Sequence, residues 1–266
     1  MVVAKAIAAR EGMGHSVADP DAVLATVDLP PLLDKVAHDH QFSTNPLDRV
    51  LIAAVGRQFR APRFSGQNGE ALRGFYYAGQ RLDSEPTRAM ALRLVDWRLL
   101  ANDSVDPQLF ASGFVAAQRP RLRDRLADLV LDCRGTTWAQ KLDALYERER
   151  MQHWCGIGIS GICHERQILM PFFDPRLTAF ARAVTPQQKA GARLAARLLT
   201  ALDAGLAGLA LDSGMSPRAL ASGGVRSLLA RTGAVTKKAL RKVGQRLRRK
   251  PAATVTLHGP PIRCGF

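Results

Sequence analysis

Cysteine is scarce in this sequence, with four residues, Cys133, Cys155, Cys163 and Cys264, in a chain of 266. So few cysteines exclude a small disulfide-stabilised secreted scaffold and favour a reduced interior. The first residues, MVVAKAIAAREGMG, also lack the charged start and apolar run of a secretory signal. We therefore expect a cytoplasmic protein.

Long apolar runs are absent as well. A membrane-spanning helix needs about 18 or more consecutive apolar residues. The longest candidate, around Leu194 to Leu211, is interrupted by Arg197 and Asp203. The sequence therefore predicts no transmembrane segment.

Acidic residues are missing from the C-terminal part of the chain. No Asp or Glu follows Asp212, whereas twelve Lys or Arg do, and residues 1–212 hold the other 26 basic residues and all 23 acidic ones. The net charge of +15 therefore belongs mainly to this basic tail. Its run from Lys237 to Lys250 is typical of a solvated tail or of a segment that contacts an anionic surface. Because no aromatic residue lies there to stack on bases, we do not expect a nucleic-acid partner.

Aromatic residues make up only 6% of the chain and β-branched residues are few, whereas Ala, Leu and Arg are abundant, which favours helix. Helix is expected over 2–11 and 31–40, and short strands over His15–Ala18 and the apolar run Val50–Val55. After Pro86, apolar residues recur at helical spacing. We predict an α/β fold, mostly helical, with three parts: an α/β layer (1–82), a helical part (83–212) and a basic tail (213–266).

Three segments, in this order along the chain, resemble the synthetase domain of the asparagine-synthase-like family. The opening helix and turn, VVAKAIAAREGMGHSVADPD, is similar to the helix that follows the family's nucleotide loop. Residues 65–77, SGQNGEALRGFYY, resemble the family's second glycine loop, S-G-x-G-G-D/E followed by glycine and tyrosine. Residues 171–177, PFFDPRL, are similar to its P-F-L-D-x-R-L motif.

The resemblance implies a partial Rossmann-like ATP-pyrophosphatase layer followed by a helical subdomain. It also implies ATP and Mg²⁺ as cofactors, a carboxylate substrate that becomes an acyl-adenylate with release of pyrophosphate, and an amine donor that attacks it to form an amide. Two family features are not found: the S-G-G-x-D-S nucleotide loop and a glutaminase half with a leading nucleophilic cysteine. We therefore expect an N-terminally truncated, incomplete ligase whose sheet is completed by an upstream segment or a partner chain.

One segment imitates the missing loop. Residues 222–227 read SGGVRS, but no apolar strand precedes them and Arg226 replaces the acidic residue that would face magnesium. Because a motif needs its structural context, we do not interpret this segment as a phosphate site.

The resemblance assigns cofactor binding to the glycine loop, where backbone N–H groups would face phosphate. The predicted cofactor-binding residues are Ser65, Gly66, Gln67, Asn68, Gly69 and Arg73. Glu70 is the predicted magnesium-side and catalytic carboxylate, since Mg²⁺ takes one or two carboxylates beside phosphate oxygens. Asn68 replaces the family's second glycine but tolerates the left-handed conformation. The alternative is an ordinary strand-to-helix connection.

The helix over LYERERMQHW supplies two further predicted catalytic residues. By resemblance it approaches the active cleft, so Tyr146 or Glu147 is a candidate general base for the attacking amine. The alternative is a solvated charged face with pairing between successive turns. For PFFDPRL we expect a packing element in which Asp174 caps the next helix. Gln167 stands where the family often has a Glu that shapes the substrate pocket, so aspartate is not assumed as the acceptor.

A second function remains open at this point. The chain is also compatible with a non-catalytic remnant that acts as a binding or scaffold protein and contacts a polyanion or membrane through its basic tail.

Overall fold

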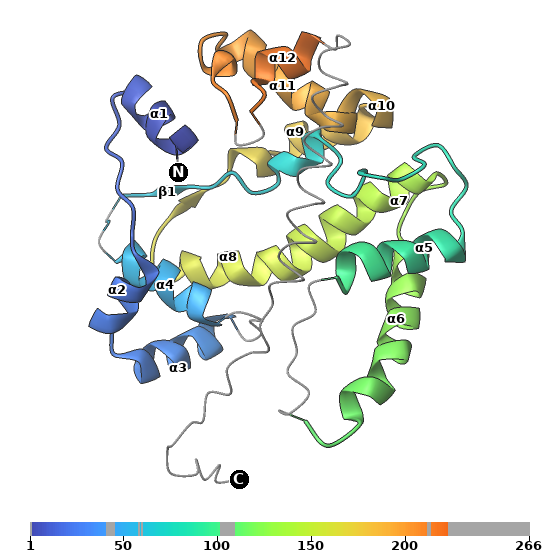
Figure 1. The fold of residues 1–266 in the computed structure, drawn as a ribbon, viewed down its shortest axis with the longest axis horizontal. Coiled ribbons are helices and arrows are strands. Elements are labelled where there is room, and N and C mark those ends of the chain that lie inside the picture. Colours follow the sequence, from blue (N-terminus) through green and yellow to red (C-terminus); the bar gives the residue numbers. More distant parts are fainter. Residues whose placement is uncertain are drawn as a thin grey trace.

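The computed structural model describes residues 2–40, 46–57, 59, 61–101, 110–211 and 214–222. The described chain is mostly helical and contains one small sheet of two parallel strands (Figure 1). The α/β class is thus confirmed in its mostly helical form. None of the helices in these ranges is long and apolar enough to cross a membrane.

A long continuous helix forms the centre of the fold (Figure 1). It consists of α7 (Trp138–Leu145), a π-helical stretch η4 (Tyr146–Cys155) and α8 (Gly156–Cys163). The junction residues Leu145 and Gly156 keep right-handed helical dihedral angles, so the axis is not broken. A capping box fixes its start, since the Thr137 side chain accepts from the backbone of Gln140 while the Gln140 side chain accepts from the backbone of Thr137.

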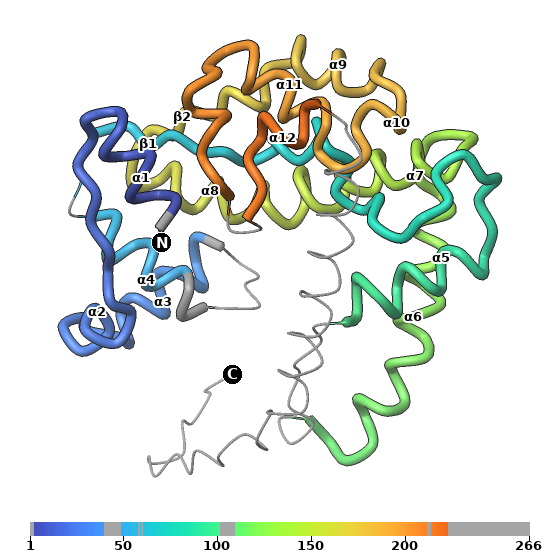
Figure 2. The backbone as a smooth tube through the Cα atoms, turned by 45° about the horizontal axis from the view of Figure 1, so that its top comes forward, coloured from blue at the N-terminus to red at the C-terminus, as the bar shows by residue number. Residues whose placement is uncertain are grey.

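The main core packs against the first part of this helix. Helices α5 (Arg88–Leu94) and α6 (Phe114–Asp132) and the π-helical turn η2 (Val95–Leu99) lie beside α7 (Figure 2). Trp138 is fully buried at the helix start, and its indole N–H donates to Gln80 at 2.9 Å. The predicted helical spacing after Pro86 is confirmed by these elements.

Four N-terminal helices occupy the other end of the molecule (Figure 1). They are α1 (Val2–Arg10), α2 (Pro20–Thr26), α3 (Leu29–His40) and α4 (Pro46–Gly56). The helices predicted over 2–11 and 31–40 are confirmed.

The two strands predicted in this N-terminal region are wrong. Val50–Val55 is part of helix α4, where Val50, Ala53 and Gly56 are buried at a spacing of three residues. This helical face packs on α3, which a strand of alternating orientation would not allow. His15–Ala18 is exposed and pairs with no strand in the described ranges.

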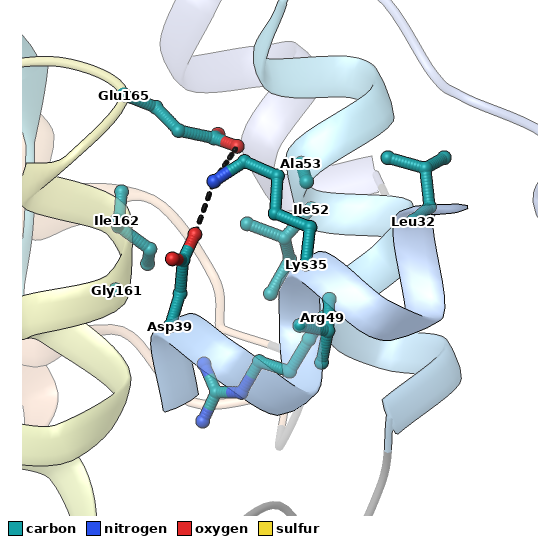
Figure 3. Close-up of a pocket in the computed structure, with 10 residues that line it drawn as sticks. Leu32, Lys35, Asp39, Arg49, Ile52, Ala53, Gly161, Ile162 and Glu165 are labelled. Carbon is teal, nitrogen blue, oxygen red and sulfur yellow. Dashed lines mark hydrogen bonds and ion pairs between the residues drawn. The ribbon is translucent and has the colours of Figure 1, made fainter. Parts of the chain in front are cut away.

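An ion pair attaches these helices to the segment that follows α8. Lys35 on α3 lies between the carboxylates of Asp39 and Glu165, with its Nζ 3.7 Å from Glu165 (Figure 3). The small pocket at this place is lined by apolar and charged residues of α3, α4 and α8 and by Glu165. Because Lys35 already pairs with both carboxylates, we interpret this place as a helix-packing seam.

The sheet joins two segments that are far apart in the sequence. Strand β1 (Arg63–Phe64) pairs in parallel with β2 (Ile168–Leu169), with Arg63 opposite Ile168 and Phe64 opposite Leu169. Each strand is followed by a 3₁₀ turn, η1 (Gly69–Leu72) after β1 and η5 (Pro171–Phe173) after β2.

The remaining helices cover the side of the long helix where the sheet lies (Figure 2). They are α9 (Pro175–Ala183), α10 (Pro186–Lys189), η6 (Ala190–Ala192), α11 (Arg193–Leu202), η7 (Leu206–Gly208) and α12 (Pro217–Ser222). Asp174 caps α9 as predicted, because its carboxylate accepts from the backbone N–H of Arg176 at 2.8 Å. The basic run Lys237–Lys250 lies outside the described residues.

Candidate functional site

Two of the three family-like segments meet at the carboxyl ends of the two strands. The loop of residues 65–74 follows β1, and the PFFD turn follows β2. The Asn68 side-chain amide donates to the backbone oxygen of Phe172 at 2.7 Å. A Cβ on Gly69 would lie 3.6 Å from the Phe172 ring. Segments about 100 residues apart in sequence thus form one structural unit.

Asn68 determines the conformation of the glycine loop. Its φ of 69° and ψ of −5° place it in the left-handed region, as the sequence predicts for a residue that replaces glycine. This left-handed conformation reverses the chain direction. It lets the Ala71 N–H donate to the Asn68 backbone oxygen, a hydrogen bond at the start of η1. Asn68 is buried, so the reversal is fixed by packing and by its bond to Phe172.

The loop presents unused backbone donors. The N–H groups of Gly66, Asn68 and Glu70 donate to no group in the described part of the chain. A Cβ built on Gly66 meets nothing within 4 Å, so a ligand can approach this backbone closely. A backbone donor that is open on one side, as at Gly66, fits an oxygen of a phosphate.

The loop also contains an unpaired acceptor. The Oε1 atom of Gln67 is buried and has no hydrogen-bond partner among the described residues. The Gln67 backbone N–H instead donates to the Ser65 hydroxyl at 3.3 Å, and the Ser65 N–H donates to Leu169 on β2. A buried acceptor of this kind is open to a hydrogen-bond donor such as water.

Glu70 and Tyr146 are brought together. The Tyr146 hydroxyl donates to Glu70 Oε2 at 3.2 Å, and Arg73 donates to Glu70 Oε1 at 3.3 Å. The Glu70 side chain keeps 32% of its surface exposed, so solvent or a cation has access to it. Two residues predicted separately from sequence therefore share one site.

The Tyr146 hydroxyl acts as a hydrogen-bond donor. Burial, reinforced by the Glu70 carboxylate, raises the pKa of Tyr146 well above its ordinary value. A phenol that holds its proton so firmly orients Glu70. This direction favours a donor role over the general-base role predicted for Tyr146.

Glu147 is not joined to this cluster. Its carboxylate accepts from the guanidinium of Arg182 on α9, with Oε2 2.6 Å from Nη2, and only 12% of the side chain is exposed. Neighbouring residues on a helix face different directions, and here Glu147 holds α9 against the long helix. Its predicted catalytic role has no support in this geometry.

Two arginines beside the loop were missed by sequence reasoning. Arg98 on η2 and Arg150 on η4 both lie over the ring of Phe75. Arg150 is one of several charged residues in the helical run LYERERMQHW. The π-helical turns that aim these side chains inward have no sequence signature, so only the glycine and aromatics of RGFYY hinted at a site.

A buried polar group supports the same region and was also missed. Lys189 on α10 is 2% exposed, and its Nζ lies 2.6 Å from Oδ2 of Asp143, which also accepts from the Tyr77 hydroxyl at 2.8 Å. Burial raises the pKa of Asp143, while the charge of Lys189 opposes that rise. The group ties the end of the glycine segment to α7, one turn before Tyr146.

The fit to magnesium rests on a single carboxylate. Within the described residues no three His, Cys, Asp or Glu side chains gather where they could hold a metal ion. Glu70 would therefore supply one ligand, with phosphate oxygens and water as the others, which is the usual arrangement for Mg²⁺ beside a nucleotide. Of the SGGVRS segment, residues 223–227 lie outside the described residues.

Comparisons of this chain with protein-family models, with curated proteins and with solved structures find no match.

Proposed function

We propose that this chain carries the glycine-loop part of an asparagine-synthase-like, AMP-forming amide-ligase site. One observation supports this most directly. The parallel strands β1 and β2 end side by side, and the SGQNGE and PFFD segments follow them there. In open α/β sheets, ligands bind beyond the carboxyl ends of parallel strands. In this proposal the pair is a remnant of a Rossmann-like ATP-pyrophosphatase layer.

The loop residues would bind the phosphate part of ATP. The free N–H groups of Gly66, Asn68 and Glu70 would donate to phosphate oxygens, and Gly66 leaves room for close approach. The Glu70 carboxylate, held by Tyr146 and Arg73, would ligate Mg²⁺. When bound, ATP would activate a substrate carboxylate for attack by an amine.

The sequence does not contain an S-G-G-x-D-S loop, so in this proposal another segment or a partner chain supplies it. The acceptor is a carboxylate whose identity Gln167 leaves unassigned. The protein's own contribution is to hold its donors and Glu70 in fixed positions before the ligand arrives.

The test is magnesium-dependent exchange of labelled pyrophosphate into ATP by the protein purified from its native cells. Exchange that needs a carboxylate substrate and falls at least about tenfold in Glu70→Gln supports the proposal. The control is Glu11→Gln, an exposed carboxylate at the end of α1. No exchange with any carboxylate, or equal exchange in Glu70→Gln, would contradict it.

A second candidate is a non-catalytic binding or scaffold protein, which the charge of the tail favours. Twelve basic and no acidic residues follow Asp212. This candidate predicts salt-sensitive binding to polyanions or anionic vesicles that disappears when residues 233–266 are removed, with no binding of magnesium–ATP.

A further inference from the structure

Two positive side chains share one aromatic ring beside the glycine loop. The guanidinium carbon of Arg98 lies 5.3 Å from the Phe75 ring centroid, and that of Arg150 lies 4.4 Å from it. These two distances place the guanidinium carbons less than 10 Å apart. Arg98 also lies 5.6 Å from the Tyr76 ring, and Arg150 lies 4.6 Å from the Trp154 ring. Stacking on rings fixes both planar groups in place.

Neither arginine is neutralised by a carboxylate within the described ranges. The arginines at positions 10, 73, 88, 123, 134, 148, 176 and 182 each have an Asp or Glu within ion-pair distance. Arg98 instead donates to the backbone oxygen of Phe75 at 3.3 Å. Both side chains are only partly exposed. Two half-buried positive charges within this distance repel each other, and a bound anion would relieve that repulsion.

The surroundings add hydrogen-bond donors to the charges. The Phe75 ring lies 5.4 Å from the ring of Tyr146, whose hydroxyl reaches Glu70. Burial raises the pKa of Tyr76 and of Cys155, and the charge of Arg150 opposes both shifts. Both arginines come from π-helical turns, η2 and η4, a local geometry common at functional sites.

We propose that Arg98 and Arg150 form a clamp, stacked on Phe75, that binds a phosphoryl anion. Guanidinium groups match the oxygens of phosphate in paired hydrogen bonds, and stacked groups lose little freedom on binding. The choice of a phosphoryl anion over a carboxylate rests on the proposed function, because Glu70 offers a magnesium ligand on the adjoining loop. The clamp itself stands on the geometry of the two arginines.

The test is calorimetric titration of the full chain with inorganic pyrophosphate, without magnesium or ATP, at about 150 mM salt to screen the exposed charges. We expect one pyrophosphate per chain. Arg98→Gln and Arg150→Gln should each weaken binding at least about tenfold, the loss typical of a charged hydrogen-bonding group. The matched controls are Arg93→Gln on α5 and Arg148→Gln on η4, both exposed, which should change binding less than about twofold.

Two further variants keep the result interpretable. Phe75→Leu removes the shared ring and leaves both charges, so it should weaken pyrophosphate binding. Thermal melting should show that this variant is still folded. Glu70→Gln should tighten magnesium-free pyrophosphate binding, because it removes a nearby negative charge. Failure of ATP exchange with an intact clamp would therefore count against the proposed function alone.

Three outcomes would overturn the clamp. The wild-type chain could bind no pyrophosphate, or the control variants could lose as much affinity as Arg98→Gln and Arg150→Gln. Binding that survives both clamp substitutions and disappears on removal of residues 233–266 would assign pyrophosphate to the basic tail. Succinate that binds through the two arginines more tightly than pyrophosphate would overturn the phosphoryl assignment.

Discussion

The hydroxyl of Tyr146 donates a 3.2 Å hydrogen bond to the carboxylate of Glu70, a residue 76 positions earlier in the chain. One partner lies on the glycine loop after β1, and the other begins the π-helical stretch of the central helix. The bond therefore connects the two parts of the chain that the sequence separates into an α/β layer and a helical part. In our account it holds Glu70 ready for a cation.

Tyr146→Phe removes this bond and keeps the ring. Because Arg73 remains within 3.3 Å of Glu70, we expect the free energy of unfolding to fall by only about 0.5–1.5 kcal/mol. The free energy of magnesium-dependent ATP binding, measured by calorimetry, should change by more than the free energy of unfolding. A variant that binds as the wild type does would show that Tyr146 has no part in positioning Glu70.

Gly66→Val should block ligand access to the glycine loop without affecting folding. A Cβ at this position meets nothing within 4 Å and the backbone is not in the left-handed region, so the melting temperature should stay within about 2 °C of the wild type. The new side chain should block approach to the loop N–H groups and abolish ATP binding. Gly208→Ala, where an added Cβ would meet only the Arg218 side chain at 3.9 Å, is the matched control and should change neither property. Undiminished ATP binding by Gly66→Val would exclude this face of the loop.

Lys189→Met should be among the most destabilising substitutions in the chain. It leaves the Asp143 carboxylate enclosed with only the Tyr77 hydroxyl, and breaking a buried pair on one side costs about 3–5 kcal/mol. Urea unfolding measures this loss. The double variant Asp143→Leu/Lys189→Met should recover much of the stability, whereas a loss below about 1 kcal/mol in Lys189→Met would show that the ion pair is not structurally important.

Asp174 should give a measurable pH dependence. Hydrogen bonds from the side chain and backbone of Arg176 lower its pKa to about 2, from an ordinary 3.8. The folded state thus favours the charged form, so the stabilisation is present above pH 3.8 and is lost as the pH falls toward 2. The melting-temperature difference between wild type and Asp174→Asn should be constant from pH 5 to 7 and shrink below 3.8. A carboxyl titration near 3.8 by NMR would refute this.

Local signals predicted the parts of the fold that depend on local interactions. The helices after Pro86 and the Asp174 cap follow from apolar spacing and capping chemistry, and both are observed. Val50–Val55 was misassigned because a short apolar run is equally compatible with a strand and with a buried helix. In the structure the segment is helical and packs against α3.

The site was predictable only in pieces. The glycine loop and the PFFD segment were identified from the family resemblance, but they meet through the pairing of β1 with β2, two residues on each side. So short a strand has no periodicity to detect. Arg98 and Arg150 were missed because no motif of the sequence marks them, whereas the structure places both over the ring of Phe75.

The most direct test of the account is a calorimetric titration of the purified full chain with ATP, with and without Mg²⁺, for wild type and Glu70→Gln. We predict that the wild type binds one ATP and that magnesium tightens the binding. In Glu70→Gln the magnesium effect should disappear while the chain remains folded. Absence of ATP binding by the wild type, or an unchanged magnesium effect in Glu70→Gln, would contradict the assignment of this loop as a magnesium–nucleotide site.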